Sequence, residues 1–141
     1  MGDPVGPNAE WPTKRVVEQR IRNRLIEYFE FASSFTAQLR YEAAAPIVHV
    51  PYEIINQWED WTLGLDLWLD EAQVYTAEEK EALRRFQVVW DRAADDLADD
   101  YPALRQVQAM PAWKELRQEA ELALAVFAHR GRLPEDHERW P

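Results

Sequence analysis

The stretch Thr76–Leu97, TAEEKEALRRFQVVWDRAADDL, decides the fold class. Its first four residues predict a capping box, in which the Thr76 hydroxyl accepts an amide hydrogen of the first turn and the Glu79 carboxylate reaches back to the Thr76 amide. Apolar residues then recur every three or four positions, which is the spacing of one face of an amphipathic helix. These core-facing residues are Leu83, Phe86, Trp90, Ala93 and Leu97. The helix must end before Pro102, because proline interrupts a helix.

The chain on either side has the same helical spacing. Thr13 to Leu39 predicts one long helix, with the Thr13 hydroxyl as its cap. Its apolar stripe is Val17, Ile21, Leu25, Tyr28, Ala32, Phe35 and Leu39. Pro111–Gly131 predicts a second long helix, which the glycine ends, and a short helix is expected before it in residues 102–110. The inward residues of the second long helix are Trp113, Leu116, Ala120, Leu124 and Phe127.

A further helix is expected to begin in the stretch Val50–Trp61, VPYEIINQWEDW. Pro51 suits a first helical turn, where its missing amide hydrogen has no partner. One face of this helix, if it continues, carries Ile54, Trp58, Trp61, Leu65 and Trp68. Past Thr62, however, leucines alternate with other residues and Gly64 interrupts the pattern. Residues 62–75 are compatible with a helix buried on two sides, with a distorted turn or with a short strand.

Together these patterns predict an all-α fold, a single-domain bundle or orthogonal array of four to five helices. A chain of 141 residues most simply forms one domain. We expect residues 13–131 to form the helical domain. Residues 1–12 are expected to form a flexible N-terminal arm, and residues 132–141 a flexible C-terminal tail. The first twelve residues, MGDPVGPNAEWP, lack the basic and apolar regions of a signal peptide.

The composition narrows the class of partner. The chain has 26 acidic and 16 basic residues, so its net charge is −10. A negative field of this size repels nucleic acids and anionic lipid and favours a basic protein partner. No apolar run reaches the length of about 18 residues that a membrane helix needs. The chain has no cysteine, which excludes disulfides and thiolate metal sites and fits a cytoplasmic location.

Negative charge is concentrated in the middle of the chain. Residues 25–72 carry one basic and nine acidic side chains. A second acidic run, Asp91–Asp100, places several carboxylates at the C-terminal end of the predicted helix, where each costs about 0.3–1 kcal/mol against the helix dipole. Either the helix ends early and the last aspartates cap the next turn, or this cost is retained for a partner.

Motifs for catalysis and for cofactors are absent from the sequence. With only four glycines there is no phosphate-binding loop, and neither Glu-x-x-His nor His-Glu-x-x-His occurs. We therefore expect no enzyme activity, no cofactor and no metal. One local cluster offers an acid, a base and an aromatic group together: His49, Tyr52 and Glu53. Since His49 should precede the helix that Pro51 begins, a packing or capping role is the simpler interpretation of this histidine.

The favoured hypothesis is a small acidic module that binds a basic protein surface. Bacterial immunity proteins and antitoxins share this composition, although no motif assigns the chain to a family. Half-buried aromatic rings beside carboxylates suit an arginine- or lysine-rich partner. The predicted interface residues are Glu53, Trp58, Glu59, Asp60, Trp61, Asp66, Asp70, Asp91 and Asp95. Two alternatives stay open: a ligand-binding protein or enzyme with a pocket near His49 and Glu53, and a homo-oligomer that associates through the tryptophan face.

Overall fold

The computed structural model describes residues 11–97 and 99–140, and all regular secondary structure within them is helical. The predicted all-α class is therefore confirmed. The predicted N-terminal arm lies almost entirely outside the described residues. Within the described part of the chain, no helix combines the length and apolarity that a membrane crossing requires.

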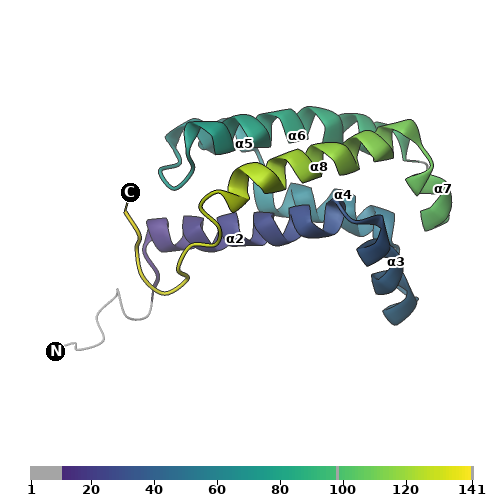
Figure 1. Cartoon of the computed structure of the whole chain (residues 1–141), viewed down its shortest axis with the longest axis horizontal. Helices are drawn as coiled ribbons and strands as arrows, with labels where there is room; N and C mark the ends of the chain where they lie inside the picture. Colours follow the sequence, from purple (N-terminus) through teal and green to yellow (C-terminus); the bar gives the residue numbers. More distant parts are fainter. Residues whose placement is uncertain (1–10, 98, 141) are drawn as a thin grey trace.

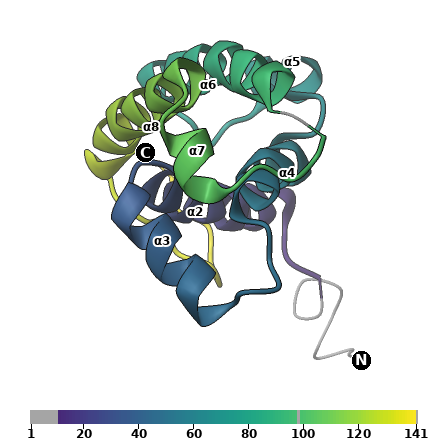
Figure 2. The same cartoon turned by 90° about the vertical axis from the view of Figure 1, so that its right-hand side faces the viewer.

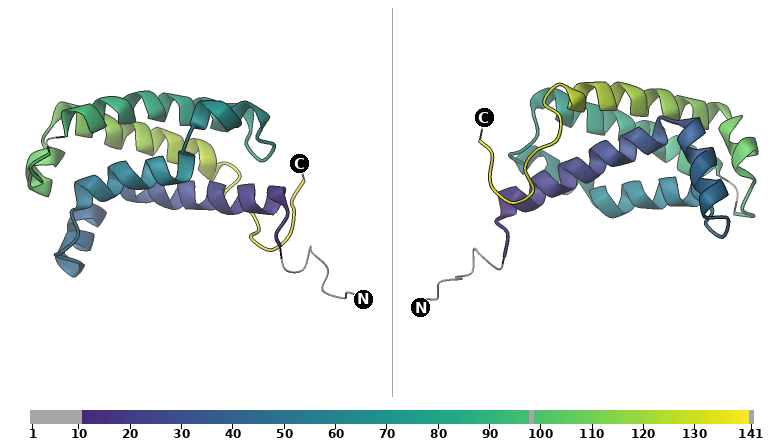
Figure 3. Two further views of the ribbon diagram at one scale, coloured as in Figure 1. Left: turned by 180° about the vertical axis from the view of Figure 1, so that it is seen from behind. Right: turned by 60° about the horizontal axis from the view of Figure 1, so that its bottom comes forward.

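Four long helices form the body of the molecule and run in alternating directions along its long axis (Figure 1). They are α2 (Lys14–Ala32), α4 (Val50–Thr62), α6 (Ala77–Asp96) and α8 (Pro111–Ala128). Viewed from the end, they surround a common centre (Figure 2). The shorter helices α3 (Phe35–Ala44) and α7 (Leu104–Gln108) lie together at one end of this bundle. At the other end, α5 (Leu65–Trp68) and the 3-10 turn η1 (Leu69–Glu71) connect α4 to α6 (Figure 3).

The first long helix is shorter than the sequence predicts. It ends at Ala32, and the chain turns before α3 begins at Phe35. The Ser34 hydroxyl accepts a hydrogen bond of 3.0 Å from the Ala37 amide and so caps α3. Serine at a helix start competes with continuation of the preceding helix, because its side chain satisfies an amide that has no helical partner. The prediction of one helix through Leu39 is therefore wrong.

The buried face of α2 is also wider than the predicted stripe. Val17 is 39% exposed, whereas Val16, Ile26 and Phe29 are buried. The reason is that α2 packs against both α4 and α8, so it buries residues on two adjoining sides. Polar residues on this face are buried as well, among them Arg22. A narrow apolar stripe with the helical period of 3.6 residues predicts packing against one neighbouring helix. It does not reveal the second neighbouring helix.

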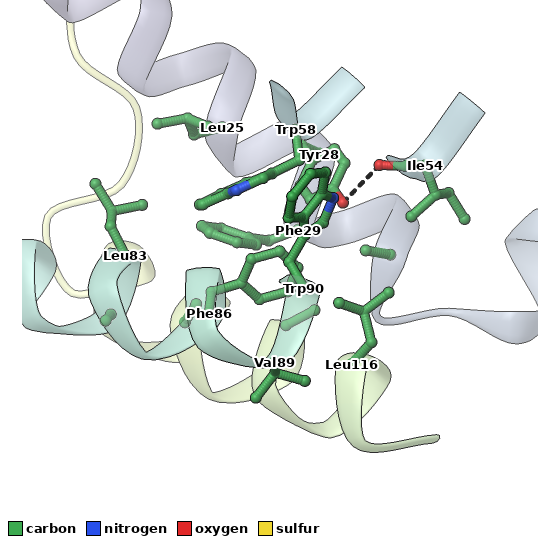
Figure 4. Close-up of a cluster of buried hydrophobic side chains, with 14 of the residues drawn as sticks. Leu25, Tyr28, Phe29, Ile54, Trp58, Leu83, Phe86, Val89, Trp90 and Leu116 are labelled. Atoms are coloured by element: carbon green, nitrogen blue, oxygen red, sulfur yellow. Dashed lines mark hydrogen bonds between the residues drawn. The ribbon is translucent and has the colours of Figure 1, made fainter. Parts of the chain in front are cut away.

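Aromatic side chains fill the centre of the bundle (Figure 4). The Trp58 ring lies 4.6 Å from the Phe86 ring and 5.9 Å from the Phe29 ring, measured between centroids. These rings join α2, α4 and α6, and the Tyr28 hydroxyl donates a 2.8 Å hydrogen bond to the Ile54 carbonyl oxygen. The predicted core face of α6 is buried throughout. Large aromatic rings fill the space between α4 and α6. The two helices therefore contact each other through these side chains, because their backbones are not close together.

A buried ion-pair cluster ties three helices together. The predicted capping box of α6 is present, with Thr76 and Glu79 exchanging two hydrogen bonds of 3.1 Å. The same Glu79 carboxylate also accepts from Arg22 on α2 at 2.7 Å and from Arg130, just beyond α8, at 2.6 Å. Arg22 is fully buried and Glu79 nearly so. Of these contacts of Glu79, the sequence predicts only the capping of α6 and not the ion pairs with Arg22 and Arg130.

The C-terminal segment is packed against α2, which corrects the prediction of a flexible tail for residues 132–140. The buried Asn23 side chain donates to the Leu133 carbonyl at 2.8 Å and accepts from the Leu133 amide at 2.9 Å. Gln19 similarly donates to the carbonyl oxygens of Pro134 and His137, both at 2.8 Å. Backbone groups of the segment thus form hydrogen bonds with amide side chains of α2. The polar, proline-containing sequence of the segment gives no reason to expect these hydrogen bonds.

Candidate functional site: an acidic surface at the α4–α5 turn

The α4 helix ends in a sharp turn at Leu63 and Gly64. Gly64 has φ +66° and ψ 41°, a left-handed conformation that costs most other residues about 1–2 kcal/mol. The Gly64 carbonyl then accepts a 2.7 Å hydrogen bond from the Leu67 amide, which starts α5. Of the three possibilities for residues 62–75, the structure has the distorted turn, followed by α5 and η1.

This turn explains the alternating leucines. Leu65 and Leu69 point into the core and are almost fully buried, whereas Leu63 is 77% exposed and Leu67 is 88% exposed. Two neighbouring leucines in water forgo the free energy of burial, which is about 1.5–3 kcal/mol for a fully buried leucine. A contiguous exposed apolar patch that is rimmed by polar residues is one mark of a protein-binding surface.

Beside the two leucines lies a depression of about 280 Å³, called here the acidic hollow. Its carboxylates come from three different elements: Glu59 from α4, Asp66 from α5 and Asp91 from α6. Leu63 and Leu67 form its apolar edge. The structure therefore brings the three predicted interface carboxylates Glu59, Asp66 and Asp91 together, although they lie up to 32 positions apart in the sequence.

Two consecutive hydrogen bonds, from the buried Trp58 ring to the exposed Asp91 carboxylate, support the wall of the acidic hollow. The Trp58 indole N–H donates to Gln87 Oε1 at 2.9 Å, and Gln87 Nε2 donates to Asp91 Oδ1 at 3.2 Å. Trp58 itself has no exposed surface. The prediction that Trp58 contacts a partner is therefore wrong, because its ring belongs to the core and its polar edge is satisfied by Gln87. Its contribution to the surface is indirect, since the relay orients Asp91.

The carboxylates of the acidic hollow have no cationic partner within the described part of the chain. None of Glu59, Asp66 and Asp91 forms an ion pair with an arginine, lysine or histidine described here. Across residues 11–97 and 99–140, no three acidic or histidine side chains converge closely enough to hold a metal ion. What this arrangement offers is negative charge around an apolar edge, which suits a lysine or arginine side chain.

The other predicted interface residues lie outside the acidic hollow. Asp70 pairs with Arg84 and so already has a cation. Glu53, near the start of α4, accepts a 3.2 Å hydrogen bond from Gln57. Asp95 lies one helical turn beyond Asp91, close to the end of α6 at Asp96. The helix thus ends before Asp99 and Asp100, the last aspartates of the acidic run.

Trp61 and Asp60 border a second depression, called here the apolar groove, which has a volume of about 350 Å³. Its walls come from α2, from the end of α4, from the α4–α5 turn with α5, and from the segment before α6. The apolar and aromatic residues of the groove are Val17, Ile21, Trp61, Leu63, Trp68 and Tyr75. Leu63 lines both the groove and the acidic hollow. The groove could not be predicted from the sequence, because the helical spacing assigns Val17 to the core-facing stripe.

The His49 side chain has the capping role that Pro51 suggested. Its Nδ1 accepts from the Tyr52 amide at 3.4 Å, and its Nε2 lies 2.8 Å from the Pro102 carbonyl oxygen. A carbonyl only accepts, so Nε2 carries the hydrogen in this arrangement. Both ring nitrogens are therefore used within the fold, which leaves neither of them to bind a ligand beside Glu53.

The chain matches no protein-family model, no curated protein and no solved structure. The acidic hollow and its leucine edge are therefore the features on which a function is argued.

Proposed function

We propose that this protein is a protein-binding module that docks on a basic partner surface through the acidic hollow and the two leucines at its edge. The observation that carries the proposal is the combination of two strongly exposed leucines with three carboxylates from three separate elements. Scattered acidic residues on a helix face are ordinary solvated groups. When the fold groups carboxylates around exposed apolar side chains, the apolar side chains can be buried by a partner and the carboxylates favour a partner of positive charge.

The two kinds of group contribute differently to such a complex. Burying Leu63 and Leu67 against a partner supplies roughly 3–6 kcal/mol, using about 1.5–3 kcal/mol for each leucine. The carboxylates add less affinity, but they accelerate encounter with a basic surface and penalise acidic ones. The hydrogen bond from Trp58 to Gln87 holds one wall of the hollow, which reduces the ordering required on binding.

The charge of the whole chain favours a partner that itself binds anions. A net charge of −10 steers the protein toward strongly basic surfaces, such as the nucleic-acid site of a toxin or nuclease. An inhibitor of the immunity or antitoxin type, acting in the cytoplasm, is the form of the proposal that best fits this small acidic helical chain. Its action would be to occupy the basic site in place of nucleic acid.

A capture experiment from a lysate of the source organism, at low salt, tests the proposal. The native protein is compared with Leu63→Ser/Leu67→Ser and with Glu59→Lys/Asp91→Lys, after circular dichroism has shown that each variant is helical. The matched control is Leu122→Ser/Glu121→Lys on α8, where Leu122 is 58% exposed. A basic protein retained by native and control but lost by both hollow variants supports the proposal. Equal retention by all four proteins, or no retention, refutes it.

The homo-oligomer is the second candidate, because the same two exposed leucines could meet their copies. Repulsion between two acidic hollows opposes a symmetric contact at this place. Analytical ultracentrifugation decides between the two functions. A native dimer that Leu63→Ser/Leu67→Ser dissociates assigns the face to self-association, whereas a native monomer removes this candidate.

A further inference from the structure

A row of α2 side chains binds the backbone of the C-terminal segment, which runs beside the first half of α2 (Figure 1). Arg15, Gln19 and Asn23 lie one helical turn apart and form what is called here the segment-binding face. Asn23 exchanges two hydrogen bonds with the backbone of Leu133. Gln19 Oε1 accepts from the Arg139 amide at 2.8 Å, and Arg15 Nε donates to the Arg139 carbonyl oxygen at 2.9 Å. Because these hydrogen bonds go to the backbone, most of the recognition does not depend on the sequence of the segment.

Two side chains of the segment make the contacts that do depend on sequence. Leu133 is 5% exposed and belongs to the core cluster, so its place requires an apolar side chain. Glu135 Oε2 accepts from Asn23 Nδ2 at 2.8 Å and from Arg24 Nη2 at 2.5 Å. The hydrogen bond from Asn23 and the Arg24 guanidinium lower the pKa of Glu135 below its ordinary value, so this side chain is bound as a carboxylate. The segment-binding face therefore selects a leucine that is followed two positions later by a glutamate.

The charge of the first half of α2 also favours an acidic peptide. Residues 14–24 carry five basic side chains and one acidic side chain. Among the basic ones, Arg15, Arg20 and Arg24 donate hydrogen bonds to the segment. This charge is opposite to that of the acidic hollow, so the two surfaces select different partners.

Apart from hydrogen bonds, few buried contacts hold the segment in place. Within residues 132–140, Leu133 is the only buried side chain, and most of the others are exposed. A segment with few buried apolar contacts opens at a lower free energy than the core of a domain. Packing against α4 and α8 keeps α2 in the bundle when the segment opens. Local opening therefore exposes the segment-binding face without unfolding the bundle.

We propose that the segment-binding face is a peptide-binding site that the C-terminal segment occupies, and that an acidic partner peptide with a leucine two positions before a glutamate binds there when the segment opens. The hydrogen bonds to the backbone supply affinity, whereas the place of Leu133 and the Arg24 guanidinium supply selectivity. The segment is tethered beside the site, so it competes as a ligand at high effective concentration. This site shares no residue with the acidic hollow, and either proposal can fail without the other.

Fluorescence anisotropy with a fluorescein-labelled synthetic peptide of residues 131–140, GRLPEDHERW, tests the site. The peptide is titrated with the native full-length chain and with full-length Leu133→Ser/Glu135→Lys, called here the segment variant. Circular dichroism first shows that the segment variant is helical. We expect saturable one-to-one binding to the segment variant, and binding to the native protein that is weaker by at least about tenfold because its own segment competes. A scrambled peptide of the same composition should bind neither protein.

Substitutions on both sides of the contact locate the bound peptide. A peptide that carries Leu133→Ser should bind the segment variant at least about tenfold more weakly, because it lacks the buried leucine. Asn23→Asp in the segment variant should have a similar effect, since an aspartate cannot donate to the peptide and repels its glutamate. The matched control, Asn56→Asp, makes the same charge change at an exposed position of α4 and should leave the affinity unchanged. Equal binding by the native protein and the segment variant, no binding to the folded segment variant, or binding that ignores Asn23→Asp overturns the site.

Hydrogen exchange of the native protein tests the local opening without any substitution. The Leu133 and Arg139 amides donate to side chains of α2. Both should exchange faster than the amide of Leu83, which lies in the buried core of α6 and exchanges only through larger unfolding. Excess unlabelled peptide should speed the exchange of the two segment amides, because it stabilises the open molecule. Exchange of both amides at the rate of Leu83 would contradict the local opening on which the proposal depends.

Discussion

Replacing Glu79 with glutamine tests the buried ion-pair cluster that joins α2, α6 and the end of α8. Arg22 has no exposed surface, and its guanidinium donates to Glu79 through Nη2 at 2.7 Å and Nε at 3.2 Å. Arg130 donates to the same carboxylate at 2.6 Å and 3.2 Å. In the variant, an uncharged amide with its own N–H donors faces two guanidinium groups.

The expected loss is about 3–5 kcal/mol, which is the usual cost of removing one partner from a buried ion pair. Arg22 keeps the backbone carbonyls of Gly131 at 2.6 Å and Phe127 at 3.3 Å, but its charge is no longer balanced. A domain of this kind is stable by about 5–15 kcal/mol, so the change removes a large share of the total. The α6 capping box adds little to this cost, since the side-chain oxygen of a glutamine at position 79 also accepts from the Thr76 amide.

Urea unfolding followed by circular dichroism measures the loss. The matched control is Glu121→Gln, which removes the exposed pairing with Arg117 within α8 and should cost less than about 1 kcal/mol. If Glu79→Gln costs no more than Glu121→Gln, the buried cluster does not stabilise the fold and the reasoning is refuted. In Arg22→Met/Glu79→Leu, which removes the charges at both positions, much of the lost stability should return.

Acid titration gives the same cluster a second readout. Burial acts to raise the pKa of Glu79, but hydrogen bonds from Arg22 and Arg130 outweigh it and lower the pKa below its ordinary value. A carboxylate with a lowered folded-state pKa contributes stability above its unfolded pKa of about 4.3, and that stability is lost as the pH falls through the folded pKa. Stability should therefore decline below about pH 4, and less steeply in Glu79→Gln.

The α4–α5 turn and the C-terminal segment each contain one residue whose replacement has a distinct expected result. Gly64→Ala should lower the free energy of unfolding by about 1–2 kcal/mol, because φ is +66° and an added Cβ would lie 3.2 Å from Leu67 Cδ1, whereas Gly64→Asn should cost less in a urea titration. Asn23→Ala should speed tryptic cleavage after Arg132 severalfold, because Asn23 holds the Leu133 backbone by two hydrogen bonds; equal cleavage rates in native and variant protein would contradict this.

The α6 helix could be predicted from the sequence because every local signal agrees with the tertiary structure. Its capping box marks the start of the helix, and its buried residues follow the helical period. The same reasoning failed at Ser33 and Ser34, where apolar spacing continues through Phe35 and Leu39 although the helix does not. Apolar spacing indicates which residues face the core. The same spacing can continue across a turn that joins two helices, so it does not show where the first helix ends.

The C-terminal segment shows a different limit of sequence reasoning. Its order depends on Gln19 and Asn23, more than 100 positions away, whose amide side chains bond its backbone. A polar residue in a helical pattern is predicted to be solvent-exposed. No local rule distinguishes an exposed amide side chain from one that forms hydrogen bonds with a distant part of the backbone. The hidden partners of Glu79 were missed for the same reason, since Arg22 and Arg130 lie 57 and 51 positions from it.

The candidate site could be predicted in part. Acidic residues near α4 were recognised, but their grouping depends on the turn at Gly64, which sends Asp66 toward Asp91 and leaves Asp70 to pair with Arg84. A continuous helix would instead have placed Asp66 and Asp70 on one side. Where the sequence left residues 62–75 undecided, it left the composition of the surface undecided too.

The two tryptophans of α4 show how one short stretch serves both the core and the surface. Trp58 points inward and, through Gln87, orients Asp91, while Trp61 is 38% exposed in the apolar groove. A step of three residues on a helix turns the side chain by about 60° short of a full turn, so the two rings diverge. Between them, Glu59 faces the acidic hollow and Asp60 the groove. The buried position of Trp58 thus sets the directions in which Glu59 and Asp60 leave the helix.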